Sequence, residues 1–193
     1  MIRRLYEGIL ALSGKPSAPY VLAAVAFAES SFFPVPPDAM LVPMSVSRPD
    51  RVWLYALIAT AASVVGGLAG YAIGALLFDS LGQWLIALYG LQGSAATFQD
   101  SYARYGHWVI LLKGLTPIPY KLVTITSGFA HYSLAWFTIL SILTRGARFF
   151  ILAGLLGRYG VQIRGVLDRH LNAVAAISVA VIVLGFALFK VVL

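Results

Sequence analysis

Six ionisable side chains stand within the most apolar parts of this 193-residue sequence, two of them carboxylates and four of them cations. They are Glu29 and Asp38, and Lys113, Lys121, Arg145 and Arg148. An ionisable group inside hydrocarbon is costly, and it usually serves a function. The surplus of cations suits an anion, and arginine suits phosphate because its guanidinium donates two parallel hydrogen bonds. Anion binding is one interpretation of this set, and a purely structural network of ion pairs is the other.

The composition indicates that these side chains lie in a membrane. The sequence is 60% hydrophobic and only 11% charged, with a mean hydropathy of +0.87, whereas soluble domains carry roughly 25% charged residues. The net charge of +7 comes from scattered basic residues, which disfavours nucleic acid as a partner and is typical of cytoplasmic loops. The chain has no cysteine, so disulfides and thiolate metal sites are excluded. We therefore predict an integral membrane protein with a single domain.

Prolines interrupt two of the apolar segments, 18–47 and 107–131. Each arm beside the prolines is shorter than the roughly 20 residues that a spanning helix needs. We therefore predict two re-entrant hairpins, with backbone of irregular shape at their tips. The tip prolines are Pro34, Pro36 and Pro37 in the first hairpin and Pro117 and Pro119 in the second.

The rest of the chain divides by the length and amphipathicity of its apolar runs. The predicted segments are an interfacial helix at 1–16, a transmembrane helix at 52–78, an interfacial connector at 80–104, and transmembrane helices at 134–157 and 171–192. A signal peptide is an alternative for the N-terminus, although Gly14, Pro16 and Pro19 interrupt its apolar run. In the helix at 52–78, Gly66, Gly70 and Gly74 recur every fourth residue, which predicts close packing against a neighbouring helix.

The two hairpins look like copies of each other at an offset of 83 positions. At this offset Pro34-Val35-Pro36 falls on Pro117-Ile118-Pro119, and Trp53 falls on Trp136. Because one spanning helix separates the hairpins, the second would enter the membrane from the opposite side, as in inverted-repeat transporters. A cytoplasmic N-terminus agrees with this arrangement, since it gathers most arginines and lysines on the inside.

The charges of the two hairpins differ in sign. At the same offset Asp38 falls on Lys121, and Glu29 lies one position from the match to Lys113. The first hairpin is therefore acidic where the second is basic, and the two could form ion pairs if they face each other. No spacing of histidines and carboxylates predicts a metal site, and no nucleophile with a base predicts an enzyme. We expect no cofactor.

Two stretches of the sequence resemble the DedA membrane proteins, also called the SNARE-associated Golgi or VTT family. They are ESSFFPVPPD, from Glu29 to Asp38, and KGLTPIPYK, from Lys113 to Lys121, which Gly128 follows. The resemblance covers roughly residues 18–160 and implies opposed re-entrant hairpins and lipid translocation. Bacterial members are associated with recycling undecaprenyl phosphate or flipping phospholipid, with the proton motive force implicated, and eukaryotic relatives are scramblases. The family's acidic positions match Glu29 and Asp38, but its usual R-F-x-P-x-x-R is replaced here by lysines around T-P-I-P-Y.

The predicted fold is therefore an all-α integral membrane protein: an inverted repeat of two re-entrant hairpins, each followed by a transmembrane helix, plus a C-terminal transmembrane helix. The expected function is transport of a phosphate-bearing lipid across the bacterial inner membrane, flippase- or scramblase-like. The four cations would hold the anionic headgroup, and the two carboxylates would balance them and take up a proton. A carrier of a small soluble anion and a non-transporting scaffold are the alternatives. Membrane lipids are the expected partners, and a homo-oligomer is compatible with the sequence.

Overall fold

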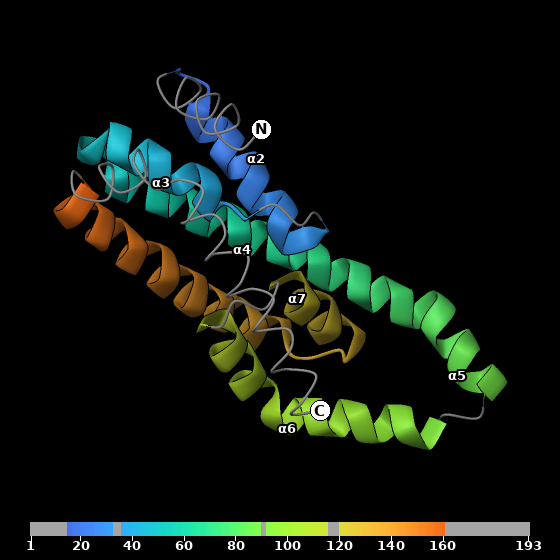
Figure 1. Ribbon diagram of the computed structural model, residues 1–193. Coiled ribbons are helices and arrows are strands. Elements are labelled where there is room, and N and C mark those ends of the chain that lie inside the picture. The colour runs from blue at the N-terminus through green and yellow to red at the C-terminus, as the bar shows by residue number, and fades with distance from the viewer. Residues whose placement is uncertain (1–14, 33–35, 90–91, 116–119, 161–193) are drawn as a thin grey trace, which may run out of the picture.

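The computed structural model describes residues 15–32, 36–89, 92–115 and 120–160, and every regular element in these ranges is helical. The α-helices that Figure 1 labels are α2 (Ala18–Ser31), α3 (Asp38–Ser47), α4 (Val52–Leu77), α5 (Gln83–Tyr89), α6 (Gln92–Leu115) and α7 (Tyr120–Phe129). A further helix, Leu134–Gly160, is drawn in orange, and we call it the arginine helix because it carries Arg145 and Arg148. The predicted all-α class is confirmed for these ranges.

Among the described helices, two are long and apolar enough to cross a membrane. One is α4 with its short flanking turns η1 (Pro49–Arg51) and η2 (Phe78–Gly82), which make a continuous helical run of 34 residues. The other is the arginine helix, with 27 residues. They coincide with the predicted transmembrane helices at 52–78 and 134–157. The predicted span at 171–192, and nearly all of the interfacial helix at 1–16, lie outside the described residues.

The two long helices pack against each other in antiparallel orientation (Figure 1). Near the start of α4, the Trp53 ring stacks on Phe150 with 6.0 Å between the centroids. Two turns before the end of α4, Tyr71 packs on Phe137 with 5.3 Å between the centroids. The beginning of each helix therefore lies beside the end of the other.

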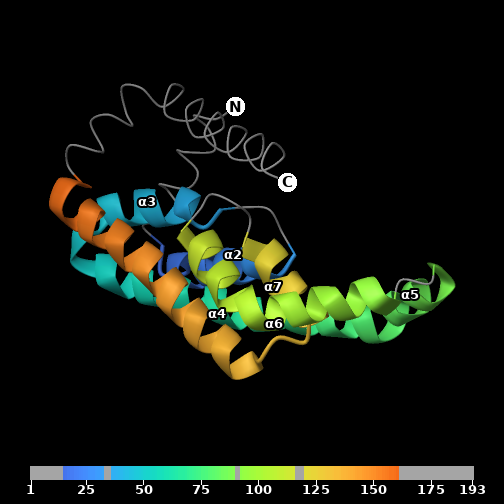
Figure 2. The ribbon, with the colours of Figure 1, turned by 90° about the horizontal axis from the view of Figure 1, so that it is seen from below.

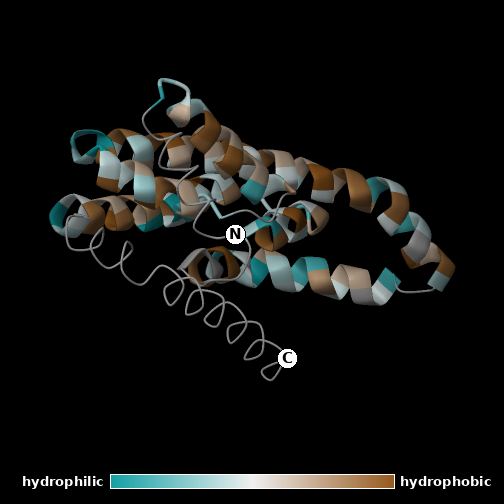
Figure 3. Ribbon diagram, turned by 45° about the horizontal axis from the view of Figure 1, so that its top comes forward, coloured by the Kyte–Doolittle hydropathy of each residue, from teal (hydrophilic) through white to brown (hydrophobic). Residues whose placement is uncertain are grey.

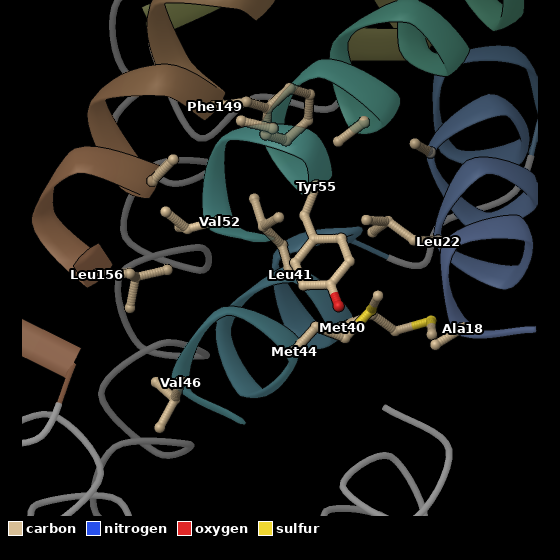
Figure 4. Packing of buried hydrophobic residues seen from close by; sticks show 14 residues of the cluster. Ala18, Leu22, Met40, Leu41, Met44, Val46, Val52, Tyr55, Phe149 and Leu156 are labelled. Atoms are coloured by element: carbon tan, nitrogen blue, oxygen red, sulfur yellow. The ribbon is translucent and has the colours of Figure 1, made fainter. Parts of the chain in front are cut away.

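The short helices cover this pair and complete its core. Around the first half of α4, α2 and α3 bury an apolar cluster with the end of the arginine helix (Figure 4). Its largest fully buried members are Leu22, Leu41, Met44, Val52, Phe149 and Leu156. Each such side chain contributes about 1.5–3 kcal/mol when it is fully buried. This cluster fixes both arms of the first proline-centred segment against the two long helices.

The glycines of α4 allow its neighbours to approach backbone to backbone. A Cβ atom at Gly66 would collide with the main chain of Phe27 in α2, and one at Gly74 would collide with the main chain of Ile125 in α7. Gly70 lies against the side chain of Thr124, also in α7. The predicted packing role of these three glycines is confirmed.

Gly128 of α7 offers a direct test of this close packing. A Cβ atom there would collide with the carbonyl group of Tyr71, which belongs to the backbone and cannot rotate away. We expect Gly128→Ala to lower the free energy of unfolding by about 1–3 kcal/mol, the usual cost of overpacking. The matched control is Gly93→Ala in α6, where a Cβ atom meets nothing within 4 Å. Equal thermal unfolding of both variants in detergent would contradict this packing.

Helix α6 joins two segments that the sequence analysis separates at residues 104–107. It runs without interruption from Gln92 to Leu115, and Gly106 does not end it. Gly106 lies against the rings of Tyr102 and Tyr132, and the absence of a side chain allows these rings to pack closely on the helix. The first half of α6 projects together with α5 and the last part of α4 (Figures 1 and 2), and it is more polar than α4 (Figure 3).

Candidate functional site

Arg145 is buried near the middle of the arginine helix and is held from several sides. Its Nε donates a hydrogen bond to Ser63 Oγ of α4 at 2.6 Å. Its Nη2 donates to Glu29 Oε2 of α2 at 2.7 Å, in an ion pair whose side chains are 4% and 14% exposed. The guanidinium also lies 4.8 Å from the ring centroids of both Tyr120 and Phe149. Arg145 thereby connects α2, α4 and α7 through one side chain.

Small hydroxyl groups extend this site between the helices. Ser30 Oγ lies 2.7 Å from Ser63 Oγ and 3.2 Å from Glu29 Oε2. Thr124 Oγ1 donates to the carbonyl oxygen of Ser30 at 3.1 Å, which ties α7 to α2. The Tyr120 hydroxyl group donates to Ser141 Oγ of the arginine helix. These contacts satisfy polar groups that would otherwise be costly in an apolar interior.

Arg148 forms a second ion pair, one helical turn further along. Its Nη2 donates to Asp38 Oδ2 at 2.5 Å, and the two side chains are 35% and 28% exposed. Asp38 Oδ1 is buried and has no hydrogen-bond partner among the described residues. Asp38 is also the first residue of α3, where the helix dipole favours a negative charge.

The two ion pairs replace the pairing that the sequence suggested. The carboxylates of α2 and α3 bind the arginine helix, and no ion pair joins Lys121 to a carboxylate in the part of the chain that the structure describes. The reason is geometric: residues three apart share one helical face, so Arg145 and Arg148 reach Glu29 and Asp38 together. Lys121 is partly buried near the start of α7, and the side chain of Lys113 is not among those described.

The structure places only part of the predicted hairpin tips. Pro36 is exposed, whereas Pro37 is buried and directly precedes α3. The other tip prolines, Pro34, Pro117 and Pro119, lie outside the described residues.

The sequence analysis did not single out Ser30, Ser63 or Tyr120. A signal for Ser63 was present, because it lies three residues before Gly66 on the small-residue face of α4, and both are buried. For Ser30 the signal was its position next to Glu29.

Two relatives match nearly the full length of the chain. One, from Haemophilus influenzae, is described as an uncharacterized protein and is 31% identical over 189 residues, which cover 96% of this chain and 96% of that protein. The other, also described as uncharacterized, is from Histophilus somni; it is 31% identical over 181 residues, which cover 93% of this chain and 94% of that protein. No protein-family model and no solved structure matches the chain. An argument for function therefore starts from the site.

Proposed function

The chain belongs to the same family as these two uncharacterized proteins, and we propose that it transports a phosphate-bearing lipid, such as undecaprenyl phosphate or a phospholipid. The observation that carries the proposal is Arg148: a partly exposed arginine in an apolar helix of membrane length, whose one carboxylate contact within the described residues is Asp38. A cation in that position suits a phosphate that travels through a polar path while its lipid tail stays in the bilayer. The resemblance to DedA proteins supports the same proposal.

Exposed apolar side chains support a location in the membrane. They lie along the outer faces of both long helices: Trp53, Leu54, Leu57, Val65 and Leu76 on α4, and Leu134, Trp136, Ile139, Ile142, Leu143, Ile151 and Leu155 on the arginine helix. Soluble monomers rarely expose so much contiguous apolar surface. Lipid tails are the natural cover for these faces. The arginine and lysine distribution favours an N-terminus in the cytoplasm, and the resemblance to bacterial DedA proteins favours a bacterial inner membrane.

The packing of the short helices supports the inverted repeat. At the offset of 83, α3 of the first unit corresponds to residues 121–130, which nearly coincide with α7. Helix α7 packs on α4, while α3 packs beside α4 and contacts the arginine helix through the ion pair between Asp38 and Arg148. Each second arm therefore contacts the long helix of the other unit. Such an exchange is what a two-fold axis between antiparallel helices would generate.

The inverted repeat predicts opposite exposure of two engineered cysteines in this cysteine-free chain. We expect Ser47→Cys, at the end of α3, to react from the cytoplasmic side with a reagent that cannot cross membranes. We expect Gln92→Cys, at the start of α6, to react from the opposite side. Both native side chains are exposed. Reaction of both cysteines from one side would rule out the inverted repeat.

The six charged side chains have two different roles: one ion pair holds the helices together, and the other groups serve the ligand. Glu29 neutralises Arg145 within a fully packed site, so this pair positions helices. Arg148, Lys121 and Lys113 would hold the phosphate, with Asp38 as their counter-charge. This division refines the expectation that all four cations bind the headgroup.

Purified protein in liposomes distinguishes lipid transport from its alternatives. A fluorescent lipid with a phosphate headgroup is placed in both leaflets, and a reductant that cannot cross the bilayer is added outside. Lipid transport predicts that the inner-leaflet fluorescence is also lost, whereas protein-free liposomes keep it. Accumulation of radioactive phosphate inside, with the inner-leaflet fluorescence retained, would instead indicate a soluble-anion carrier. Neither signal would indicate a scaffold and would reject the proposal.

A further inference from the structure

The two ion pairs of the arginine helix differ in how completely their groups are satisfied. Arg145 uses both Nε and Nη2 and lies against two aromatic rings. Arg148 makes one hydrogen bond within the described residues, to Asp38, and keeps about a third of its side chain exposed. A guanidinium has five N–H donors, so Arg148 retains donors for another acceptor. The pair of Arg145 with Glu29 is therefore buried, whereas the pair of Arg148 with Asp38 leaves N–H donors that a ligand can reach.

Asp38 is also incompletely satisfied as the partner of Arg148. A carboxylate accepts through both oxygens, yet only Oδ2 reaches the guanidinium, while Oδ1 is buried with no partner among the described residues. A buried acceptor without a partner costs free energy. The contact between Asp38 and Arg148 is therefore held less firmly than a fork that grips both oxygens.

We propose that Asp38 is an internal competitor of the ligand: its carboxylate occupies Nη2 of Arg148, one of the two nitrogens that a phosphate gripped by the guanidinium fork needs, so the phosphate gains the whole fork only when Asp38 leaves. Carboxylate and phosphate oxygens accept from the same guanidinium fork, and Arg148 is the exposed member of the two arginines. This inference rests on the proposed phosphate-binding function. Its consequence is that Asp38 weakens binding, which favours release of a ligand that must leave the site to be transported.

The test compares two carboxylates that each pair with an arginine of the same helix. Asp38→Asn keeps the size of the side chain and removes the competing charge. We expect it to bind dodecyl phosphate about two- to fivefold more tightly than the wild type, the range set by a partly exposed ion pair. The matched control is Glu29→Gln, which should bind no more tightly, because Arg145 remains buried. Affinities are measured by calorimetry in a neutral detergent, with inorganic phosphate as a second probe and melting temperatures as the check of folding.

The outcomes separate this inference from the proposed function. If Asp38→Asn binds dodecyl phosphate more tightly and Glu29→Gln does not, the role of Asp38 as a competitor is supported. An equal gain in affinity for inorganic phosphate would show that the site recognises the phosphate group and not the alkyl chain. Unchanged or weaker binding by Asp38→Asn, while the wild type binds dodecyl phosphate, overturns the competitor and leaves the function standing. Absence of binding of both probes to the wild type would overturn the proposed function. If Asp38→Asn does not fold, Asp38→Ser, which also removes the charge at the start of α3, takes its place with the same expectation.

Discussion

Replacing Arg145 by leucine is expected to lower the free energy of unfolding by about 3–5 kcal/mol, the usual effect of breaking a buried ion pair. The substitution leaves the Glu29 carboxylate buried without its cation and removes the donor to Ser63 Oγ. From the sequence alone, leucine could equally have raised stability by removing an unpaired charge. Because Arg145 pairs with Glu29, we expect the leucine variant to be less stable than the wild type. Unfolding of the purified protein in detergent measures this change in the free energy of unfolding.

Two further variants isolate the ion pair as the cause. Combining Arg145→Leu with Glu29→Leu removes both charges, and we expect most of the lost stability to return, because well-packed apolar residues often replace a buried pair without loss. Arg158→Leu is the matched control on the same helix: Arg158 is exposed, so its replacement should change the free energy of unfolding by no more than about 0.5 kcal/mol. Wild-type stability of Arg145→Leu would mean that the pair with Glu29 is not formed.

Replacing Arg148 is expected to weaken ligand binding more than it lowers the stability of the fold. We expect Arg148→Leu to weaken binding of dodecyl phosphate about 10- to 100-fold, as a hydrogen bond to a charged group is worth about 1.5–3 kcal/mol. Arg148→Lys keeps a positive charge but loses the planar fork, so most lipid transport in liposomes should also be lost. The melting temperature should fall less than for Arg145→Leu, because the Arg148 pair is partly exposed.

The same change elsewhere on the helix controls for the substitution itself. Arg158→Lys alters an exposed arginine near the end of the arginine helix, and it should leave binding and transport unchanged. Full activity of Arg148→Lys would show that a point charge is sufficient, and recognition by the guanidinium fork would then have to be abandoned.

The sequence correctly predicted the long helices and the close packing at the glycines, but it did not predict which side chains form the ion pairs. Length and hydropathy alone located α4 and the arginine helix, and the four-residue spacing of Gly66, Gly70 and Gly74 located the close-packed face of α4. The spacing of three between Arg145 and Arg148 also correctly placed both on one face. These features follow from local periodicity, which a sequence displays directly.

The ion pairs depend on how helices that are distant in the sequence pack together. The pairing of Asp38 with Lys121 that the sequence suggested is not the one that the structure shows. The offset of 83 set Asp38 opposite Lys121, but equivalent positions in two repeats touch only when they lie near the axis that relates them. Asp38 instead meets Arg148, and at the offset of 83 Arg148 falls on Val65, which carries no charge. Ser63 was overlooked for a similar reason: its hydroxyl gains a role only when the arginine helix packs against α4.

Mass spectrometry of the lipids that co-purify with the protein tests the central claim most directly. The comparison is between wild-type protein and Arg148→Leu, each extracted in the same neutral detergent and set against the lipids of the membrane from which it came. We predict that a lipid with a phosphate headgroup is enriched on the wild type and that this enrichment is lost from Arg148→Leu. Lipids that match the bulk membrane on the wild type, or equal enrichment on both proteins, would contradict phosphate recognition by Arg148.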